Sequence, residues 1–212
     1  MVMRLRVLLV LLGAFLVVAT FTFPLWQPLL TTTAVEEMLP GLPPDIQAAY
    51  GALPPDQQTT LAPILAEDPA LASLLIAAAA APDTPVSEAD QELPPVAAAT
   101  RSQGGQFRRI DPLRWAEGRV VVYQWPDNRK LVRLDEFISA RGPDLRVVLS
   151  ASPNPQTPED VRLNNLDLEL GPLKGNIGSQ QFELSPDIDL SQYASVVIFS
   201  PLANLVFSSA PL

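Results

Sequence analysis

Apolar and polar positions divide the chain into three parts, the first of which is a long apolar run near the N-terminus. The 20 residues from Val7 to Trp26 contain no charged side chain. A helix of about 20 apolar residues spans the hydrocarbon core of a membrane, roughly 30 Å. Arg4 and Arg6 precede the run, and basic residues mark the cytoplasmic side. We therefore expect residues 1–34 to form an N-terminal transmembrane anchor of a single-pass cell-membrane protein, with a cytoplasmic N-terminus and the rest of the chain extracytoplasmic.

A cleaved signal peptide is the alternative for the same run. Thr32 and Ala34 are small residues that precede a possible cleavage position. The apolar run is long for a signal peptide, and no clear Ala-x-Ala pattern follows it closely. Trp26 lies where an interfacial aromatic side chain is expected, so the pattern favours the uncleaved anchor.

Residues 35–81 carry an eleven-residue repeat, in which LPPDIQ at 42–47 returns as LPPDQQ at 53–58. Proline suits the first turn of a helix, and an early aspartate complements the positive end of the helix dipole. A third helix start follows at Asp68-Pro69 and leads into an alanine- and leucine-rich segment that Pro82 ends. The pattern predicts an acidic helical spacer. The alternative is a docking module whose apolar side chains contact a partner, namely Leu71, Leu74, Leu75 and Ile76.

Residues 82–102 are rich in proline, alanine and acidic residues and predict an extended linker. From residue 103 onward the pattern changes to short strands. The candidates are residues 106–110, 119–125, 130–135, 144–151, 166–170, 180–184, 195–199 and 204–208.

Two of these strands predict a hairpin, because Pro126-Asp127-Asn128 between them is a turn cluster. The continuously apolar residues 196–199 are typical of a central strand that is covered on both faces. Residues 103–212 therefore predict an all-β C-terminal domain, an antiparallel β-sandwich or flattened barrel of about eight strands.

Charge is distributed unevenly along the chain. Residues 35–100 hold ten acidic side chains and no basic one, whereas from Arg101 onward 12 basic residues face 13 acidic ones. Without a basic stripe the protein neutralises few phosphates, so we expect no nucleic-acid partner. The sequence has no cysteine, which removes disulfides, thiol chemistry and thiolate metal sites together.

Several segments of the C-terminal part occur in an order that is similar to one known family. They are GQF at 105–107, LVRLDEF at 131–137, GPDLRVVLS at 142–150, LKGNIGSQ at 173–180 and YASVVI at 193–198. Over residues 103–212 the chain resembles the DM-thirteen domain family, often called the electron-transfer DM domain. The resemblance implies an extracytoplasmic, β-sandwich-like domain that is sometimes fused to haem-binding or membrane redox modules. It also implies a role in electron transfer that depends on a cysteine in a late strand.

Two positions depart from the family's pattern. Ser200 stands where the family usually has a cysteine after an aromatic residue, and Arg114 stands where many members carry histidine. Serine is not reversibly oxidised as cysteine is, and arginine stays protonated and does not bind metals. The resemblance therefore implies the fold of an electron-transfer domain without the side chains that would carry the transfer.

The remaining candidate chemistry is sparse. The β domain has no histidine, methionine or cysteine to bind haem, and Tyr123 and Tyr193 suit core packing better, so we expect no cofactor. Without histidine the usual nucleophile systems lack their base, so we expect no enzymatic activity. Lys130 and Lys174, which a serine–lysine pair would need, are expected in turns.

Two pairs of carboxylates could supply oxygen ligands to a calcium ion. Asp187 and Asp189 form one pair, and Asp167 and Glu169 form another. No complete calcium-loop motif is present, so we expect turn chemistry for the first pair and a solvated strand face for the second.

Glycine and arginine clusters complete the candidates. Gly171, Gly175 and Gly178 do not lead into a helix and are expected to allow turns between strands. Four arginines lie close in sequence and form either a solvated face or a patch that binds the acidic segment or an anionic envelope polymer. They are Arg108, Arg109, Arg114 and Arg119.

These patterns favour a membrane-anchored extracytoplasmic interaction domain without a redox or catalytic centre of its own. Its expected partners are the membrane, through the N-terminal helix, and a protein of the cell envelope. The alternative is an accessory subunit of an extracytoplasmic electron-transfer system, with Trp115, Trp125 and the tyrosines as possible relay side chains. The oligomeric state stays open.

Overall fold

A computed structural model describes residues 42–86, 99–161 and 166–212 of the chain. The predicted anchor, residues 1–34, lies outside these ranges. Within the three ranges no helix combines the length and the apolar character that a membrane crossing needs. The chain divides into two compact units, residues 1–51 and residues 52–212.

The LPPD repeat begins two helices, α2 (Pro44–Ala52) and α3 (Pro55–Glu67), as predicted. The repeat also supplies a matching pair of hydrogen bonds. Gln47 Nε2 donates to the carbonyl of Leu42 at 2.9 Å, and Gln58 Nε2 donates to the carbonyl of Leu53 at 2.8 Å. Each glutamine thus ties its helix to the leucine that precedes it, which explains why the repeat extends to this position.

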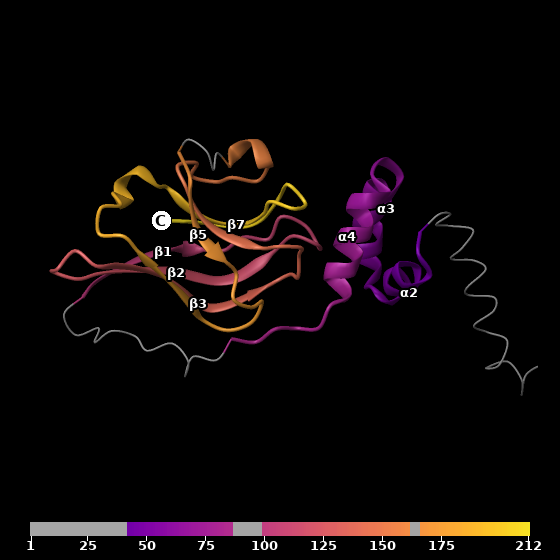
Figure 1. Cartoon of the computed structure of the whole chain (residues 1–212), viewed down its shortest axis with the longest axis horizontal. Coiled ribbons are helices and arrows are strands. Elements are labelled where there is room, and N and C mark those ends of the chain that lie inside the picture. Colours follow the sequence, from indigo (N-terminus) through magenta and orange to yellow (C-terminus); the bar gives the residue numbers. More distant parts are fainter. Residues whose placement is uncertain (1–41, 87–98, 162–165) are drawn as a thin grey trace, which may run out of the picture. The chain divides into compact units, whose positions relative to one another are not determined.

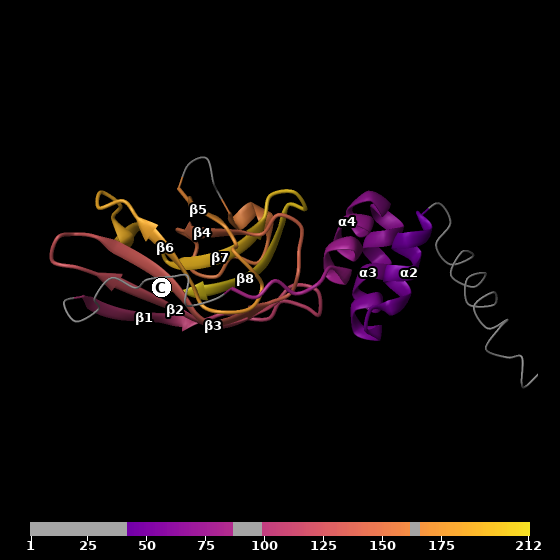
Figure 2. The ribbon, with the colours of Figure 1, turned by 60° about the horizontal axis from the view of Figure 1, so that its bottom comes forward.

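Helix α4 (Pro69–Ala80) begins at Asp68, whose carboxylate accepts hydrogen bonds from the amides of Ala70 and Leu71. Such a cap satisfies amides that the first turn leaves open. Helices α3 and α4 lie side by side in both ribbon views (Figures 1 and 2). Leu75 and Ile76, named above as possible partner contacts, are buried. We conclude that these two side chains stabilise the unit itself.

The first sheet has the order β1-β2-β3-β6, and all of its pairs are antiparallel. Its strands are β1 (Thr100–Gln106), β2 (Ala116–Gln124), β3 (Lys130–Ser139) and β6 (Gln180–Leu184). The predicted hairpin joins β2 to β3, with Val122 opposite Val132. Asn128 has a φ of 67°, a left-handed conformation that asparagine tolerates in a turn.

The second sheet has the order β5-β4-β7-β8 and is also antiparallel. Its strands are β5 (Leu168–Pro172), β4 (Arg146–Ser150), β7 (Ser195–Ser200) and β8 (Leu205–Pro211). Strand β7 is buried at each of its residues and lies between β4 and β8, as its continuous apolar run predicts. Short 3₁₀ turns at Pro158–Asp160 and Leu190–Gln192 lie in the connections.

The two sheets form two layers of the C-terminal region, and Figure 2 shows them most clearly. Phe137 of β3 and Phe207 of β8 are among its largest fully buried side chains. The rings of Phe107 and Phe137 meet edge to face with centroids 5.2 Å apart. The prediction of an antiparallel, all-β C-terminal region of about eight strands is confirmed.

Two strand predictions are displaced. Residues 107–110 do not continue a strand, because β1 covers Thr100–Gln106 and thus begins within the predicted linker. A bulge interrupts the pairing of β1 with β2 between Gln103 and Gln106. Gly104 in this bulge lies so close to the backbone of Pro211 that a Cβ atom would be 2.8 Å from its carbonyl oxygen. The other displaced strand is β5, which begins at Leu168 and not at Leu166.

Candidate functional site

Ser200, which the resemblance places at the family's cysteine position, is fully buried at the end of β7. Its Oγ donates a short hydrogen bond to the carbonyl of Pro143. The same oxygen accepts a hydrogen bond from the amide of Ala203 at 3.1 Å. Ser200 therefore joins the turn after β7 to the segment that leads into β4, and its hydroxyl group serves the fold.

Arg114, which the resemblance places at the family's histidine position, belongs to a tight turn after β1. Its Nε lies 2.6 Å from Oδ2 of Asp111, while Oδ1 of Asp111 accepts hydrogen bonds from the amides of Leu113 and Arg114, both at 2.8 Å. Among the residues that the structure describes, Ser200 and Arg114 share no hydrogen bond or ion pair. The two positions of the resemblance therefore belong to separate local structures.

A bound redox group finds no suitable donors in this domain. The sequence contains neither cysteine nor histidine, and its methionines stand at positions 1, 3 and 38, ahead of the β domain. Within the described ranges no three acidic residues come together in an arrangement suited to a metal ion. Tyr123 is buried, and its ring lies 6.2 Å from the Trp125 ring and 5.9 Å from the Arg101 guanidinium. The donor set does not fit haem iron or a soft transition metal.

The two carboxylate pairs have different roles. Asp189 caps the turn at Leu190–Gln192 and accepts hydrogen bonds from the amide and the hydroxyl of Ser191, which lower the pKa of its carboxyl group. Asp187 accepts a hydrogen bond from Ser185. Asp187 and Asp189 therefore stabilise turns through local hydrogen bonds, as expected.

The prediction of a solvated strand face for the second pair is wrong for Asp167. This residue precedes β5 and is buried, with hydrogen bonds from the Ser150 hydroxyl at 3.0 Å and the Ala151 amide at 2.8 Å. Strand alternation did not show this burial because it depends on the partner strand. Glu169 pairs with Arg146 at 2.6 Å.

The prediction of a turn is wrong for Lys130, which belongs to β3, whereas Lys174 lies in the connection between β5 and β6. Lys130 is buried at the first position of β3, and its Nζ donates to the carbonyls of Pro186 and Ile188 at 2.9 and 2.6 Å. Lys174 Nζ donates to the carbonyl of Gln181. Both ammonium groups therefore hold backbone segments in place.

Each of the four clustered arginines contacts a group of the β domain itself. Arg109 lies 4.9 Å from the Trp115 ring and 3.9 Å from Glu117, and Arg119 pairs with Asp135 at 2.8 Å. Arg114 pairs with Asp111, as described above. Arg108 donates to Asn154 at 3.2 Å. The acidic stretch before Arg101 contacts the β domain through other residues, namely Gln57 at the carbonyl of Pro112 and the segment after α4 at Arg141.

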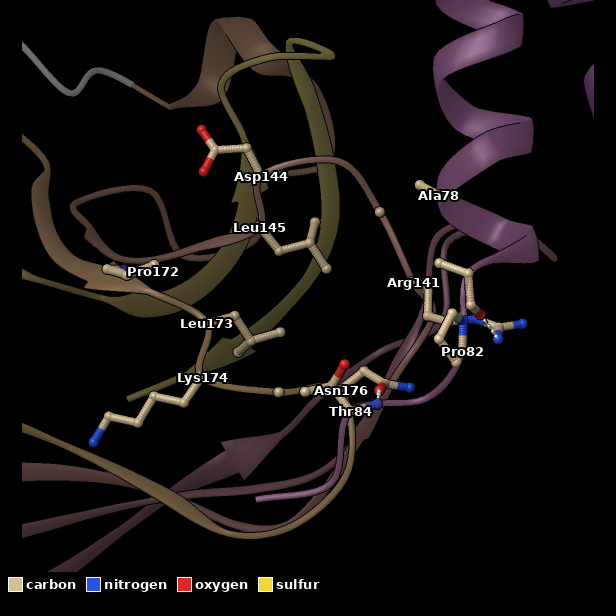
Figure 3. Close-up of a pocket in the computed structure, with 13 residues that line it drawn as sticks. Ala78, Pro82, Thr84, Arg141, Asp144, Leu145, Pro172, Leu173, Lys174 and Asn176 are labelled. Carbon is tan, nitrogen blue, oxygen red and sulfur yellow. Dashed lines mark hydrogen bonds between the residues drawn. The ribbon is translucent and has the colours of Figure 1, made fainter. Parts of the chain in front are cut away.

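At Arg141 lies a hollow of about 330 Å³ beside the C-terminal end of α4 (Figure 3). Leu145 and Leu173 lie on the β-domain side of the hollow, and Ala78 of α4 lies on the other. Arg141 Nη1 donates a short hydrogen bond to the carbonyl of Ala81, just beyond the helix end. A cation at this position also complements the negative end of the helix dipole.

Sequence reasoning missed Arg141 and Asn176 at this place. Asn176 is buried, and its side-chain amide contacts the residues that follow α4. The sequence signal nearest to this place is the pair Gly175 and Gly178 on either side of Asn176, whose expected role is to allow turns between strands. Gly178 does have a left-handed φ of 106°.

Comparison with known proteins identifies one family. The family model described as Electron transfer DM13 matches residues 107–212, half of the chain. No curated protein and no solved structure matches the chain.

Proposed function

The chain belongs to the Electron transfer DM13 family, and we propose that it is a β-sandwich interaction domain which binds a partner without a redox or catalytic centre of its own. Ser200 carries this proposal. At the position of the family's cysteine stands a fully buried hydroxyl group that is hydrogen-bonded to Pro143 and Ala203. A side chain with this role supports the fold and exchanges no electrons.

The domain works outside a membrane in this proposal, held there by the N-terminal anchor. The uncharged apolar run from Val7 to Trp26, with Arg4 and Arg6 before it, supports this placement. Helices α3 and α4 and the residues after them connect the anchor to the β domain. The partner is a protein of the cell envelope.

The hollow beside α4 is the concave surface that suits such binding best. Leu145 and Leu173 give it an apolar wall, while Arg141 and Asn176 supply polar groups at one side. Binding sites commonly combine an apolar wall with a few fixed polar groups.

Purified full-length protein in detergent tests the proposal directly. We expect no stoichiometric uptake of haem or Cu²⁺, measured by absorbance and by metal analysis, and no reversible reduction when an electron carrier is added. Stoichiometric uptake of either group, or reversible cycling of the carrier by the isolated chain, would show that the proposal is wrong.

Family membership favours a second candidate, an accessory subunit of an extracytoplasmic electron-transfer system. Electron transfer would then take place in a separate haem or quinone protein that this domain positions. Gentle detergent extraction followed by affinity purification of the chain distinguishes the two candidates. A coloured partner that co-purifies supports the accessory subunit, and a colourless one supports the general interaction domain.

A further inference from the structure

Residues 83–86, here called the strap, lie along residues 174–178 of the β domain as an added strand. Pro85 forms a parallel bridge with Ile177, which in turn forms an antiparallel bridge with Ile138 at the end of β3. The amide of Val86 donates to the carbonyl of Ile177 at 2.7 Å, and the amide of Asn176 donates to the carbonyl of Thr84 at 3.0 Å. The strap thus extends the first sheet by main-chain pairing.

The side chain of Asn176 holds two neighbouring strap residues. Its Oδ1 accepts the amide of Thr84 at 2.7 Å, and its Nδ2 donates to Oδ1 of Asp83 at 2.9 Å. The guanidinium of Arg141 lies 3.7 Å from the same carboxylate. Figure 3 shows Asn176 and Thr84 in contact, next to Arg141. One asparagine therefore recognises both a carboxylate and the amide that follows it.

Residues 174–178, here called the wall, receive the strap and are also held by hydrogen bonds within the β domain. Gln180 is fully buried, and its side chain accepts from the amide of Lys174 and donates to the carbonyl of Gly175, both at 2.8 Å. The carbonyl of Asn176 accepts from Ser139, and the amide of Gly178 donates to Phe137. None of these bonds involves the strap, so we expect residues 174–178 to keep their shape when the strap is released.

Two glycines make room for the strap backbone. A Cβ atom on Gly178 would lie 2.6 Å from the carbonyl oxygen of Val86, and a Cβ atom on Gly175 would overlap the carbonyl oxygen of Thr84. Glycine permits such a close approach of two backbones. The wall is therefore shaped for an extended segment that lies directly against it.

We propose that residues 174–178, together with Arg141, form a peptide-binding groove whose occupant in this chain is its own strap. The partner that fits is an extended segment of the form Asp-x-Pro-x, whose second and fourth amides are free to donate. Strand addition at a sheet edge is a common mode of peptide recognition. The inference rests on the proposed role as an interaction domain and names the chemistry of its partner.

The strap suits a replaceable occupant. Asp83, Thr84 and Pro85 are exposed, so main-chain pairing and the Asn176 contacts hold the segment on the surface. Pro85 stands at the third position of the pattern. The groove takes hydrogen bonds from the amides of Thr84 and Val86 but needs none from this position, so proline, which has no amide hydrogen, fits there. The sequence contains Asp-x-Pro only at residues 83–85, so no other segment of this chain carries the same pattern.

Full-length protein with Thr84→Pro and Val86→Pro tests the groove. These changes remove two strap amides and leave the wall intact. The probe is a fluorescent, end-capped peptide of residues 81–87, Ala-Pro-Asp-Thr-Pro-Val-Ser, titrated by anisotropy and by amide chemical shifts. We expect the released chain to bind it at least about 10-fold more tightly than the wild-type chain, because a tethered segment competes at millimolar effective concentration.

Matched controls define the site. A peptide with proline at both altered positions is expected not to bind. Adding Gly178→Val to the released chain is expected to abolish peptide binding. If the amide spectrum shows that the Gly178→Val chain is unfolded, Asn176→Ala is used in its place, with the same expected loss of binding.

Three results would overturn the groove. They are a folded released chain that leaves millimolar peptide unbound, equal affinity in the wild-type and released chains, and shift changes confined to residues other than 138–141 and 174–178. Uptake of haem or copper would refute the proposed function but would not change the peptide affinities or the chemical shifts. Failure of the proposed function and failure of the groove can therefore be told apart.

Discussion

Replacing Ser200 tests whether the end of β7, where the resemblance implies the family's cysteine, is closed to solvent in this chain. Ser200→Ala leaves the carbonyl of Pro143 and the amide of Ala203 without their partner at a site where the side chain is 0% exposed. Each buried polar group that loses its hydrogen bond costs about 1–3 kcal/mol. We therefore expect Ser200→Ala to lower the free energy of unfolding by about 2–4 kcal/mol, a large part of the roughly 5–15 kcal/mol typical of a domain. Urea unfolding followed by tryptophan fluorescence measures this loss.

Ser200→Cys separates burial from hydrogen bonding. A thiol is a weak donor and slightly larger than a hydroxyl group, so we expect a smaller loss, about 1–2 kcal/mol. A fully buried thiol reacts only when the structure opens, so its labelling by a disulfide reagent should be about a thousandfold slower than in urea-unfolded chain.

Ser185→Cys, at an exposed turn, is the matched control and should react at the unfolded rate. If the folded Ser200→Cys and Ser185→Cys chains react equally fast, the position is open to solvent and the argument from Ser200 fails.

Three further changes test other parts of the structure. Phe137→Ala removes a fully buried ring that packs on Phe107 and should lower the free energy of unfolding by about 3–5 kcal/mol in urea titrations; a loss below 1 kcal/mol would contradict its place in the core. Asp68→Ala removes the cap of α4 and should cost about 1 kcal/mol, with faster hydrogen exchange at the Ala70 and Leu71 amides, whereas unchanged exchange would refute the cap. Burial acts to raise the pKa of Asp135, but the hydrogen bond from Arg119 and the charge of Arg133 outweigh it, so the pKa lies below its ordinary value of 3.8. The resulting stabilisation is present above that value and is lost as the pH falls through the lowered pKa, so Asp135→Asn should destabilise the protein at pH 7 and have little effect in strong acid; equal losses at both pH values would contradict the ion pair.

Much of the architecture followed from local pattern. Proline and aspartate at the start of each repeat place the beginnings of α2 and α3 correctly, because the first turn of a helix has its own chemical requirements. The continuous apolar run in β7 indicates a strand with neighbours on both sides. The bounds of β6 were predicted without error from alternation and flanking turns.

Local pattern failed where the deciding contact is distant in sequence. Asp167 was expected on a solvated face but is buried against Ser150 and Ala151 of another segment. Strand β1 begins at Thr100, within the predicted linker, because residues 100–103 pair with β2 from Gln124 to Val121. Alternation describes which residues share a face, and it contains no information about what covers that face.

For the candidate site, the sequence by itself determined the donor set. It contains neither cysteine nor histidine and therefore lacks these two usual redox ligands, and the resemblance implies that Ser200 and Arg114 stand in their place. Only the tertiary structure decided what these residues do instead, and where the chain offers a groove. Asn176 and Asp83 are 93 residues apart, and their contact exists because two sheets bring the segment at 174–178 to the end of α4. Composition limits the chemistry of a chain, whereas folding determines which of its groups meet.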